Sequence, residues 1–169
     1  MQRHDHGPMP ALLLLLVLAM PAQAQQAGLP AFSAPYAKTP SELASLAATG
    51  GAGGSGNARV QVVTLLGDPS RPGPYSQLLR VAPHAAIPAH HHAGDRVATV
   101  LSGTWHFGYG NHFDASRLKT LPAGSVYTEP ANSAHFARTG EEAVTVLITG
   151  VGPTDTIYED PAEDPRATH

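Results

Sequence analysis

From Arg59 onward, short runs of β-branched and aromatic residues alternate with turns rich in glycine and proline. The predicted strands are RVQVVTLL, YSQLLRVA, AAIPAHHH, RVATVL, TWHFGY, SVYTEP, HFART and AVTVLITG. No segment in this part of the sequence keeps the periodicity of an amphipathic helix. Short strands at this spacing are typical of a β-sandwich or a small β-barrel, so the fold class is predicted to be all-β.

The dipeptide Ser102-Gly103 separates two of these runs and has the composition of a two-residue hairpin turn. The resulting register pairs Val100 with Trp105, Ala98 with Phe107 and Arg96 with Tyr109. The face that carries the three aromatic side chains is the better candidate for the interior. Because successive residues of an extended chain alternate between faces, counting back by twos places His90 and His92 inward and His91 outward.

Histidine is the unusual feature of the composition, because the chain has ten histidines and no cysteine. Thiolate ligands are therefore excluded, and histidine must carry any metal binding. His90 and His92 can bind one ion from the same side of a strand, and His135 from another strand is the candidate third ligand. Such a set suits one divalent transition metal, and Fe, Mn, Zn, Ni and Cu are not distinguished. The alternative is a solvated triplet with His135 packed in the core.

Two segments resemble the two sequence motifs of the cupin superfamily. HAAIPAHHHAGDRVATVLSG matches the first motif at His90, His92 and Gly103, and GSVYTEPANSAHFART matches the second at Gly124, Pro130 and His135. The resemblance covers Ala58 to Gly150. It implies a cupin-type double-stranded β-helix, or jelly-roll barrel. More narrowly, the chain resembles a group of small single-domain exported bacterial cupins.

The sequence departs from the cupin pattern at four positions. His84 stands in place of a glycine, Asn132 in place of another, and Thr139 in place of an asparagine. Asparagine tolerates the left-handed backbone that a glycine would adopt. The largest departure is Arg96, which occupies the position of a glutamate that is commonly a metal ligand in cupins. Arginine cannot take that role.

Three interpretations of Arg96 follow. A bulge at Gly94 can turn Asp95 inward as the carboxylate ligand. Alternatively the strand is regular and Arg96 faces a metal held by three histidines and water. Arg96 then needs an anionic ligand or a buried partner such as Glu129, because a lone guanidinium is repelled by the ion. In the third interpretation Arg96 lies at the rim. We favour the second, because it follows directly from the strand spacing.

The remaining candidate residues surround this cluster. Glu129 and Tyr127 share one face of SVYTEP, and the inward or outward phase of that short strand is undetermined. If they face inward, Glu129 is the candidate general acid or base and Tyr127 a candidate proton donor. The expected substrate-binding residues are Arg96, Trp105, Phe107 and Tyr109.

These features predict a metal-binding cupin that acts on a small polar or anionic molecule, in the manner of cupin oxygenases, isomerases or lyases. The alternatives are a non-catalytic exported cupin that binds a small ligand or a metal ion, and a barrel with a vestigial site. A formal charge of −3 without a basic stripe argues against nucleic acid as a partner. A homodimer formed through edge strands is compatible with the sequence.

The first part of the chain has the layout of a secretory signal peptide. An apolar run from Ala11 to Met20 precedes an Ala22-x-Ala24 cleavage pattern. The run is too short for a spanning helix. Residues 1–24 are therefore expected to be removed, which leaves a protein that is not membrane-bound and is periplasmic or secreted.

Three further segments are expected after the cleavage point. Residues 25–57 form a loosely ordered segment with a short helix, begun by Thr39, Pro40 and Glu42, and a glycine-rich linker. Residues 58–160 form the cupin domain. Residues 161–169 are a tail.

Overall fold

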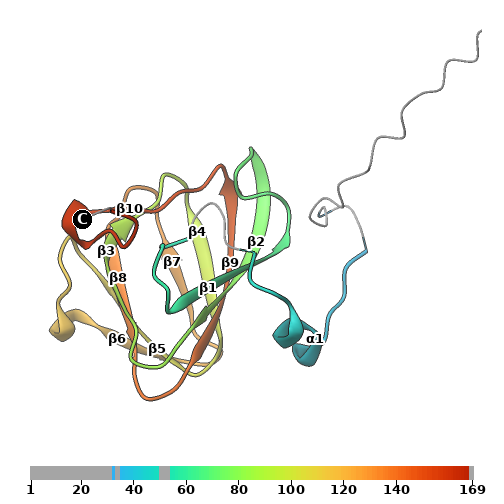
Figure 1. Ribbon diagram of the computed structural model, residues 1–169, viewed down its shortest axis with the longest axis horizontal. Helices are drawn as coiled ribbons and strands as arrows, with labels where there is room; N and C mark the ends of the chain where they lie inside the picture. Colours follow the sequence, from blue (N-terminus) through green and yellow to red (C-terminus); the bar gives the residue numbers. More distant parts are fainter. Residues whose placement is uncertain (1–31, 33–34, 50–53, 168–169) are drawn as a thin grey trace, which may run out of the picture.

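The chain folds into two antiparallel five-stranded sheets that face each other (Figure 1). The computed structural model describes residues 32, 35–49 and 54–167. One sheet has the order β1 (Val60–Leu66), β2 (Gly73–Val81), β9 (Val144–Gly152), β4 (Arg96–Ser102) and β7 (Val126–Glu129). The other has the order β10 (Ile157–Tyr158), β3 (Ala86–His91), β8 (His135–Thr139), β5 (Thr104–Tyr109) and β6 (Lys119–Pro122). The all-β jelly-roll prediction is confirmed.

The hydrophobic core fills the space between the two sheets. Strands β4 and β9 contribute Ala98, Val100, Val146 and Ile148 from one side, and β5 contributes Trp105 and Phe107 from the other. All six side chains are at least 96% buried, so the interior at this level is apolar. The polar side chains of the candidate site lie within the same inter-sheet space.

The predicted hairpin at Ser102-Gly103 is wrong. Strand β4 pairs with β7 and β9, whereas β5 pairs with β6 and β8, so the turn carries the chain from one sheet to the opposite one. The predicted inward face is nevertheless present, because both strands turn the same alternate residues toward the space between the sheets. Counting back by twos from Ala98 to His92 and His90 assumed one continuous strand, and this assumption is also wrong. Residues 93–95 connect β3 to β4, and these two strands lie in different sheets.

Gly103 makes the sharp corner between the sheets possible. Its φ of +75° lies in the left-handed region, and a Cβ there would overlap the carbonyl oxygen of Ala143 and lie 3.0 Å from Val144 Cγ2. We expect Gly103→Ala to lower the free energy of unfolding by about 1–3 kcal/mol, measured by urea denaturation. Gly124→Ala is the matched control, because Gly124 also has positive φ but open space around its Cβ position among the described residues. Equal losses in both variants would contradict the steric argument.

The short helix α1 (Pro40–Ser45) covers the outer face of β1 and β2 (Figure 1). The predicted capping box is confirmed: Glu42 N–H donates to Thr39 Oγ1, and Thr39 N–H donates to the Glu42 carboxylate. Leu43 packs on the sheet, and the guanidinium of Arg80 donates to the carbonyl oxygens of Leu43 and Leu46. The helix therefore makes β1 buried on both faces.

The expected signal peptide lies outside the described residues, as does the first half of the glycine-rich linker of residues 50–57. In the described part of that linker, Ser55 is buried and its carbonyl oxygen accepts a 2.6 Å hydrogen bond from the Tyr158 hydroxyl. This part of the segment is therefore packed against the barrel. Within the described ranges, no helix is long and apolar enough to cross a membrane.

Two strands are additional to the predicted set. β6 lies between the predicted strands TWHFGY and SVYTEP, and β10 lies near the C-terminus. β10 pairs with β3, with Ile157 opposite His91 and Tyr158 opposite His90. The C-terminal segment is thus brought next to the candidate site.

Candidate metal centre and active site

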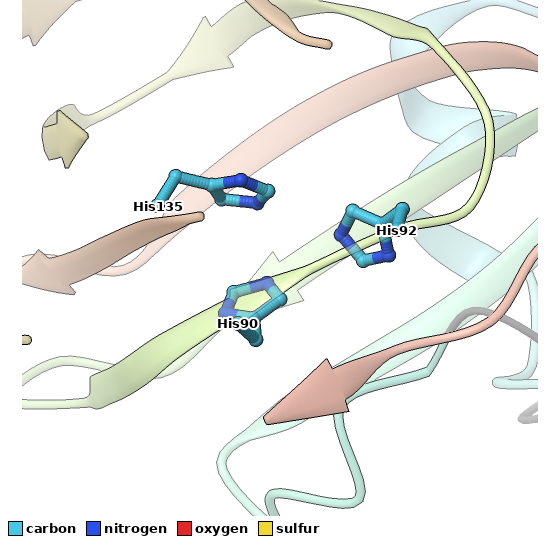
Figure 2. A group of neighbouring side chains, drawn as sticks. All are labelled: His90, His92 and His135. Carbon is cyan, nitrogen blue, oxygen red and sulfur yellow. The ribbon is translucent and has the colours of Figure 1, made fainter. Parts of the chain in front are cut away.

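His90, His92 and His135 lie together between the two sheets, with their rings turned toward one another (Figure 2). His90 and His135 are direct cross-strand partners on β3 and β8, and His92 follows the end of β3. A register shift between Ile87 and His90 accommodates a proline inside β3 and sets the inward direction of His90. One ring nitrogen from each histidine lies within 4.8 Å of those of the other two.

Backbone carbonyl groups fix the tautomer of all three histidine rings. Nδ1 of His90 donates to the carbonyl oxygen of Pro88 at 2.8 Å, and Nδ1 of His135 donates to that of Ser133 at 3.0 Å. Nδ1 of His92 donates to the carbonyl oxygen of Asp155. Because a carbonyl oxygen can only accept, each Nδ1 carries the proton and each Nε2 is unprotonated.

The environment also keeps these rings neutral. Burial lowers the pKa of His90 to about 3, assisted by the neighbouring His135. Burial and the charge of Arg96 lower the pKa of His92 to about 2, and burial lowers the pKa of His135. Neutral imidazole is the form that binds a metal ion. The Nε2 of His135 is buried and has no hydrogen-bond partner among the described residues, which is expected of a nitrogen that binds a metal ion.

Arg96 faces the interior and forms a buried ion pair with Glu129. The two residues are direct cross-strand partners on β4 and β7, each 4% exposed. Nε of Arg96 donates to Glu129 Oε2 at 2.6 Å, and its Nη2 contacts the same oxygen. Burial raises the pKa of the Glu129 carboxyl, but Arg96 and the three neighbouring histidines together outweigh this effect and lower the pKa to about 2. Burial lowers the pKa of Arg96, but Glu129, with smaller contributions from Tyr75 and Tyr127, outweighs that effect and raises the pKa.

The Glu129 carboxylate also faces the histidine cluster. Oε2 lies 3.6 Å from His92 Nε2, and Oε1 lies 3.7 Å from His135 Nε2. The Nη2 of Arg96 donates to His92 Nε2 at 2.6 Å. Arg96 therefore has the buried partner considered in the second interpretation, and the phase of β7 is inward at Glu129 and Tyr127.

Asp95 lies away from the histidines. Its side chain is exposed, and Oδ1 accepts a 2.8 Å hydrogen bond from the Ala131 backbone N–H. Residues 93–95 form an ordinary turn that ends where β4 begins, rather than an inward bulge at Gly94. Asp95 thus fixes the loop that carries the second motif instead of joining the cluster.

The aromatic candidates divide into two groups. Trp105, Phe107 and Tyr127 are buried and line the cavity, and the Phe107 ring lies 5.3 Å from the His135 ring. Burial raises the pKa of Tyr127 well above its ordinary value, so its hydroxyl stays protonated. Tyr109 is 41% exposed and donates its hydroxyl to the carbonyl oxygen of Thr128. It packs behind Phe107 rather than lining the cavity.

The backbone explains the departures from the cupin motifs. His84 and Asn132 both have left-handed φ, of +53° and +57°, at positions where a glycine would be unstrained. The tolerance expected of Asn132 is confirmed, and its N–H donates to the carbonyl oxygen of His92. Thr139 Oγ1 accepts from Ala85 N–H and donates to the carbonyl oxygen of Ala82.

The cavity between these groups has a volume of about 20 Å³, close to the size of one water molecule. Its polar lining residues are Ser55, His90, His92, Arg96, Glu129, His135 and Thr156. Ser55, Thr156 and the Asp155 carbonyl come from segments without a recognisable motif, so sequence reasoning missed them. A backbone carbonyl leaves no signal in the sequence, and the position of residues 155 and 156 depends on the pairing of β10 with β3.

Comparison of the sequence with protein-family models and with curated proteins finds no match. Among solved structures, the chain is similar to the polyketide cyclase RemF from Streptomyces resistomycificus, with 19% identity, a TM-score of 0.55, and coverage of 65% of this chain and 78% of RemF. It is also similar to the cupin domain of Schizosaccharomyces pombe Cnp3, with 14% identity, a TM-score of 0.51, and coverage of 64% and 66%.

These likenesses establish the fold, which is that of the cupins. Fold and site together define a cupin-fold protein with a buried cluster of three neutral histidines and one buried arginine–glutamate pair. The donor set fits a divalent transition metal, because three unprotonated imidazole nitrogens converge on one small polar cavity.

Proposed function

We propose that the protein is a metal-binding cupin in which His90, His92 and His135 hold one divalent transition metal at a site for a small polar or anionic molecule. The observation that carries the proposal is that one ring nitrogen from each of three buried histidines lies within 4.8 Å of the other two, while a backbone carbonyl holds the Nδ1 proton of each ring. Water alone does not require three matched tautomers. Fe, Mn, Zn, Ni and Cu all accept this set of ligands.

The charge of the site supports an anionic ligand. The histidines are neutral and Arg96 is offset by Glu129, so the protein groups of the site sum to zero. A divalent cation there would leave two positive charges in a buried space, which is costly unless an anion accompanies it. Nη1 of Arg96 is buried and has no hydrogen-bond partner in the described part of the chain, so it can donate to such a ligand.

The chemistry supported by this arrangement is proton transfer next to a polarised oxygen. A bound ion would supply the polarisation. Glu129 is ionised and can accept a proton, and Tyr127 is protonated and can donate one. Trp105 and Phe107 exclude water from the same space. Oxygenase, isomerase and lyase reactions all remain open on these groups.

Elemental analysis of purified variants tests the metal site. His90→Ala and His135→Ala each remove one of three ligands, so metal content is expected to fall from one ion per chain to background. His112→Ala is the matched control, because His112 is exposed in a loop and lies outside the cluster. Full metal content in the His90 and His135 variants would refute the proposed site.

The small volume of the cavity favours a second candidate function. At about 20 Å³, the closed site accommodates an ion or a water but no organic substrate. A non-catalytic protein that binds the ion itself would need no more room. Turnover of any member of a panel of small carboxylic and enolic acids by the metal-loaded protein would decide for the enzyme. The export that we propose rests on the N-terminal sequence pattern alone.

A further inference from the structure

We infer that Glu129 is a fourth protein ligand of the metal, supplied by β7, and that Arg96 is the positioning residue that holds its carboxylate. The inference rests on the proposed function and deepens it. In the cupin pattern the carboxylate ligand belongs at position 96, on β4. In this chain position 96 is an arginine, and the carboxylate is that of Glu129 on the adjacent strand β7 of the same sheet.

The first evidence is that Glu129 Oε1 and His135 Nε2 face each other without a hydrogen between them, whereas Arg96 Nη2 contacts both Glu129 Oε2 and His92 Nε2. Glu129 Oε1 lies 3.7 Å from His135 Nε2, and Oε2 lies 3.6 Å from His92 Nε2. The Nδ1 bonds leave both Nε2 atoms unprotonated, and the Glu129 carboxylate is paired with the Arg96 guanidinium. Lone pairs at this distance repel unless a cation lies between them. The separation is also close to that of two ligand atoms on one ion, given metal–ligand bonds of about 2.0–2.2 Å.

The second evidence is the register of β4 and β7. Arg96 and Glu129 are directly opposite, and both side chains point between the sheets. Directly opposite residues have Cβ atoms only about 5 Å apart, so side chains from either position reach the same volume. Exchange of the carboxylate between these two positions therefore keeps it within reach of the histidines. Asp95 has no such access, since it is exposed and bonded to Ala131 N–H.

The third evidence is that Arg96 binds only one of the two carboxylate oxygens of Glu129. Nε and Nη2 of Arg96 both bind Oε2, whereas Oε1 points toward His135. Oε1 is therefore the oxygen available to an ion. Nη2 of Arg96 also occupies the single lone pair of His92 Nε2, so this contact must be released when His92 binds metal. The Nε–Oε2 bond can persist through that change and keep the carboxylate in place.

The test uses the full chain and cobalt(II), whose visible absorption reports the ligand set. The central variant combines Arg96→Met with Glu129→Gln. It replaces a neutral ion pair by two neutral side chains, so it leaves no buried charge unpaired and keeps the total charge of the site. Loss of an outer-shell partner typically weakens metal binding by about 10–100-fold, and loss of a direct ligand is expected to cost at least as much. Asp95→Asn is the control for the other candidate carboxylate.

If Glu129 is a ligand, the double variant binds cobalt at least about tenfold more weakly than the unmodified chain, and its absorption bands shift. Asp95→Asn changes neither. Unchanged affinity and spectrum in the double variant would overturn the inference and leave the three-histidine proposal standing. Retention of cobalt in His90→Ala would instead defeat the proposed function itself. Single Glu129→Gln is a second measurement, and it should weaken cobalt binding at least as much as the double variant does, because Arg96 is then uncompensated.

Discussion

Arg96→Met is expected to destabilise the metal-free protein by about 3–5 kcal/mol, because it leaves the buried Glu129 carboxylate without its counter-ion. The two side chains are each 4% exposed, so water cannot replace the lost hydrogen bonds without opening the barrel. Urea denaturation of the metal-free variant at neutral pH measures the loss. This amount is a large fraction of the stability of an ordinary domain.

The double variant Arg96→Met with Glu129→Gln supplies the control for this effect. Removing both charges leaves nothing unpaired, so most of the lost stability should return, and a double-mutant cycle gives the coupling between the two residues. Saturating metal should also restore Arg96→Met more than it stabilises the unmodified chain, because the ion then compensates Glu129. A single variant that is as stable as the unmodified protein would show that Glu129 finds other compensation.

Acid is expected to unfold the metal-free protein from about pH 6.5 downward. His90 and His92 stay neutral in the folded state to about pH 3 and 2, while the unfolded chain takes up their protons near pH 6.5. The unfolded state therefore binds more protons as the pH falls, and stability declines by about 1.4 kcal/mol per pH unit for each histidine. Glu129 adds to the loss below its ordinary pKa of 4.5, since its folded-state pKa is about 2.

Urea denaturation between pH 8 and pH 4 checks this prediction. With His135 included, the combined slope approaches about 4 kcal/mol per pH unit, enough to exhaust ordinary domain stability within a few pH units. A His90→Gln variant should show a shallower slope, by about 1.4 kcal/mol per pH unit, because the new side chain does not titrate. Stability that does not change between pH 7 and pH 5 would mean that the three histidines titrate alike in both states.

The inward and outward faces of β4 and β5 could be predicted from the sequence, whereas their pairing could not. Alternation of side chains is a local property, so Val100, Trp105 and Phe107 were correctly placed in the interior although β4 and β5 do not pair. A two-residue glycine turn has the same local signature whether it closes a hairpin or carries the chain between facing sheets. The choice depends on distant partners such as β9 and β8.

The partners of the candidate site were less predictable than its histidines. The phase of β7 was undetermined because the strand has four residues, too few to show an alternation, and Pro130 follows it directly. The structure alone places Glu129 opposite Arg96. β10 was missed because it has two residues, and its position depends on pairing with β3. The roles of the individual residues in binding or catalysis stay predictions until the variants are made.

The carbonyl of Asp155 that orients His92 lies 63 residues further along the chain than His92 itself. Ribosomal synthesis therefore produces all three histidines before it produces the group that sets the tautomer of one of them. Tyr158, which pairs with His90, comes later still. A growing chain can present imidazoles to passing ions, but with the His92 ring still free to turn and to exchange its proton between nitrogens. The metal site that we propose is thus fully assembled only when β10 has docked on β3.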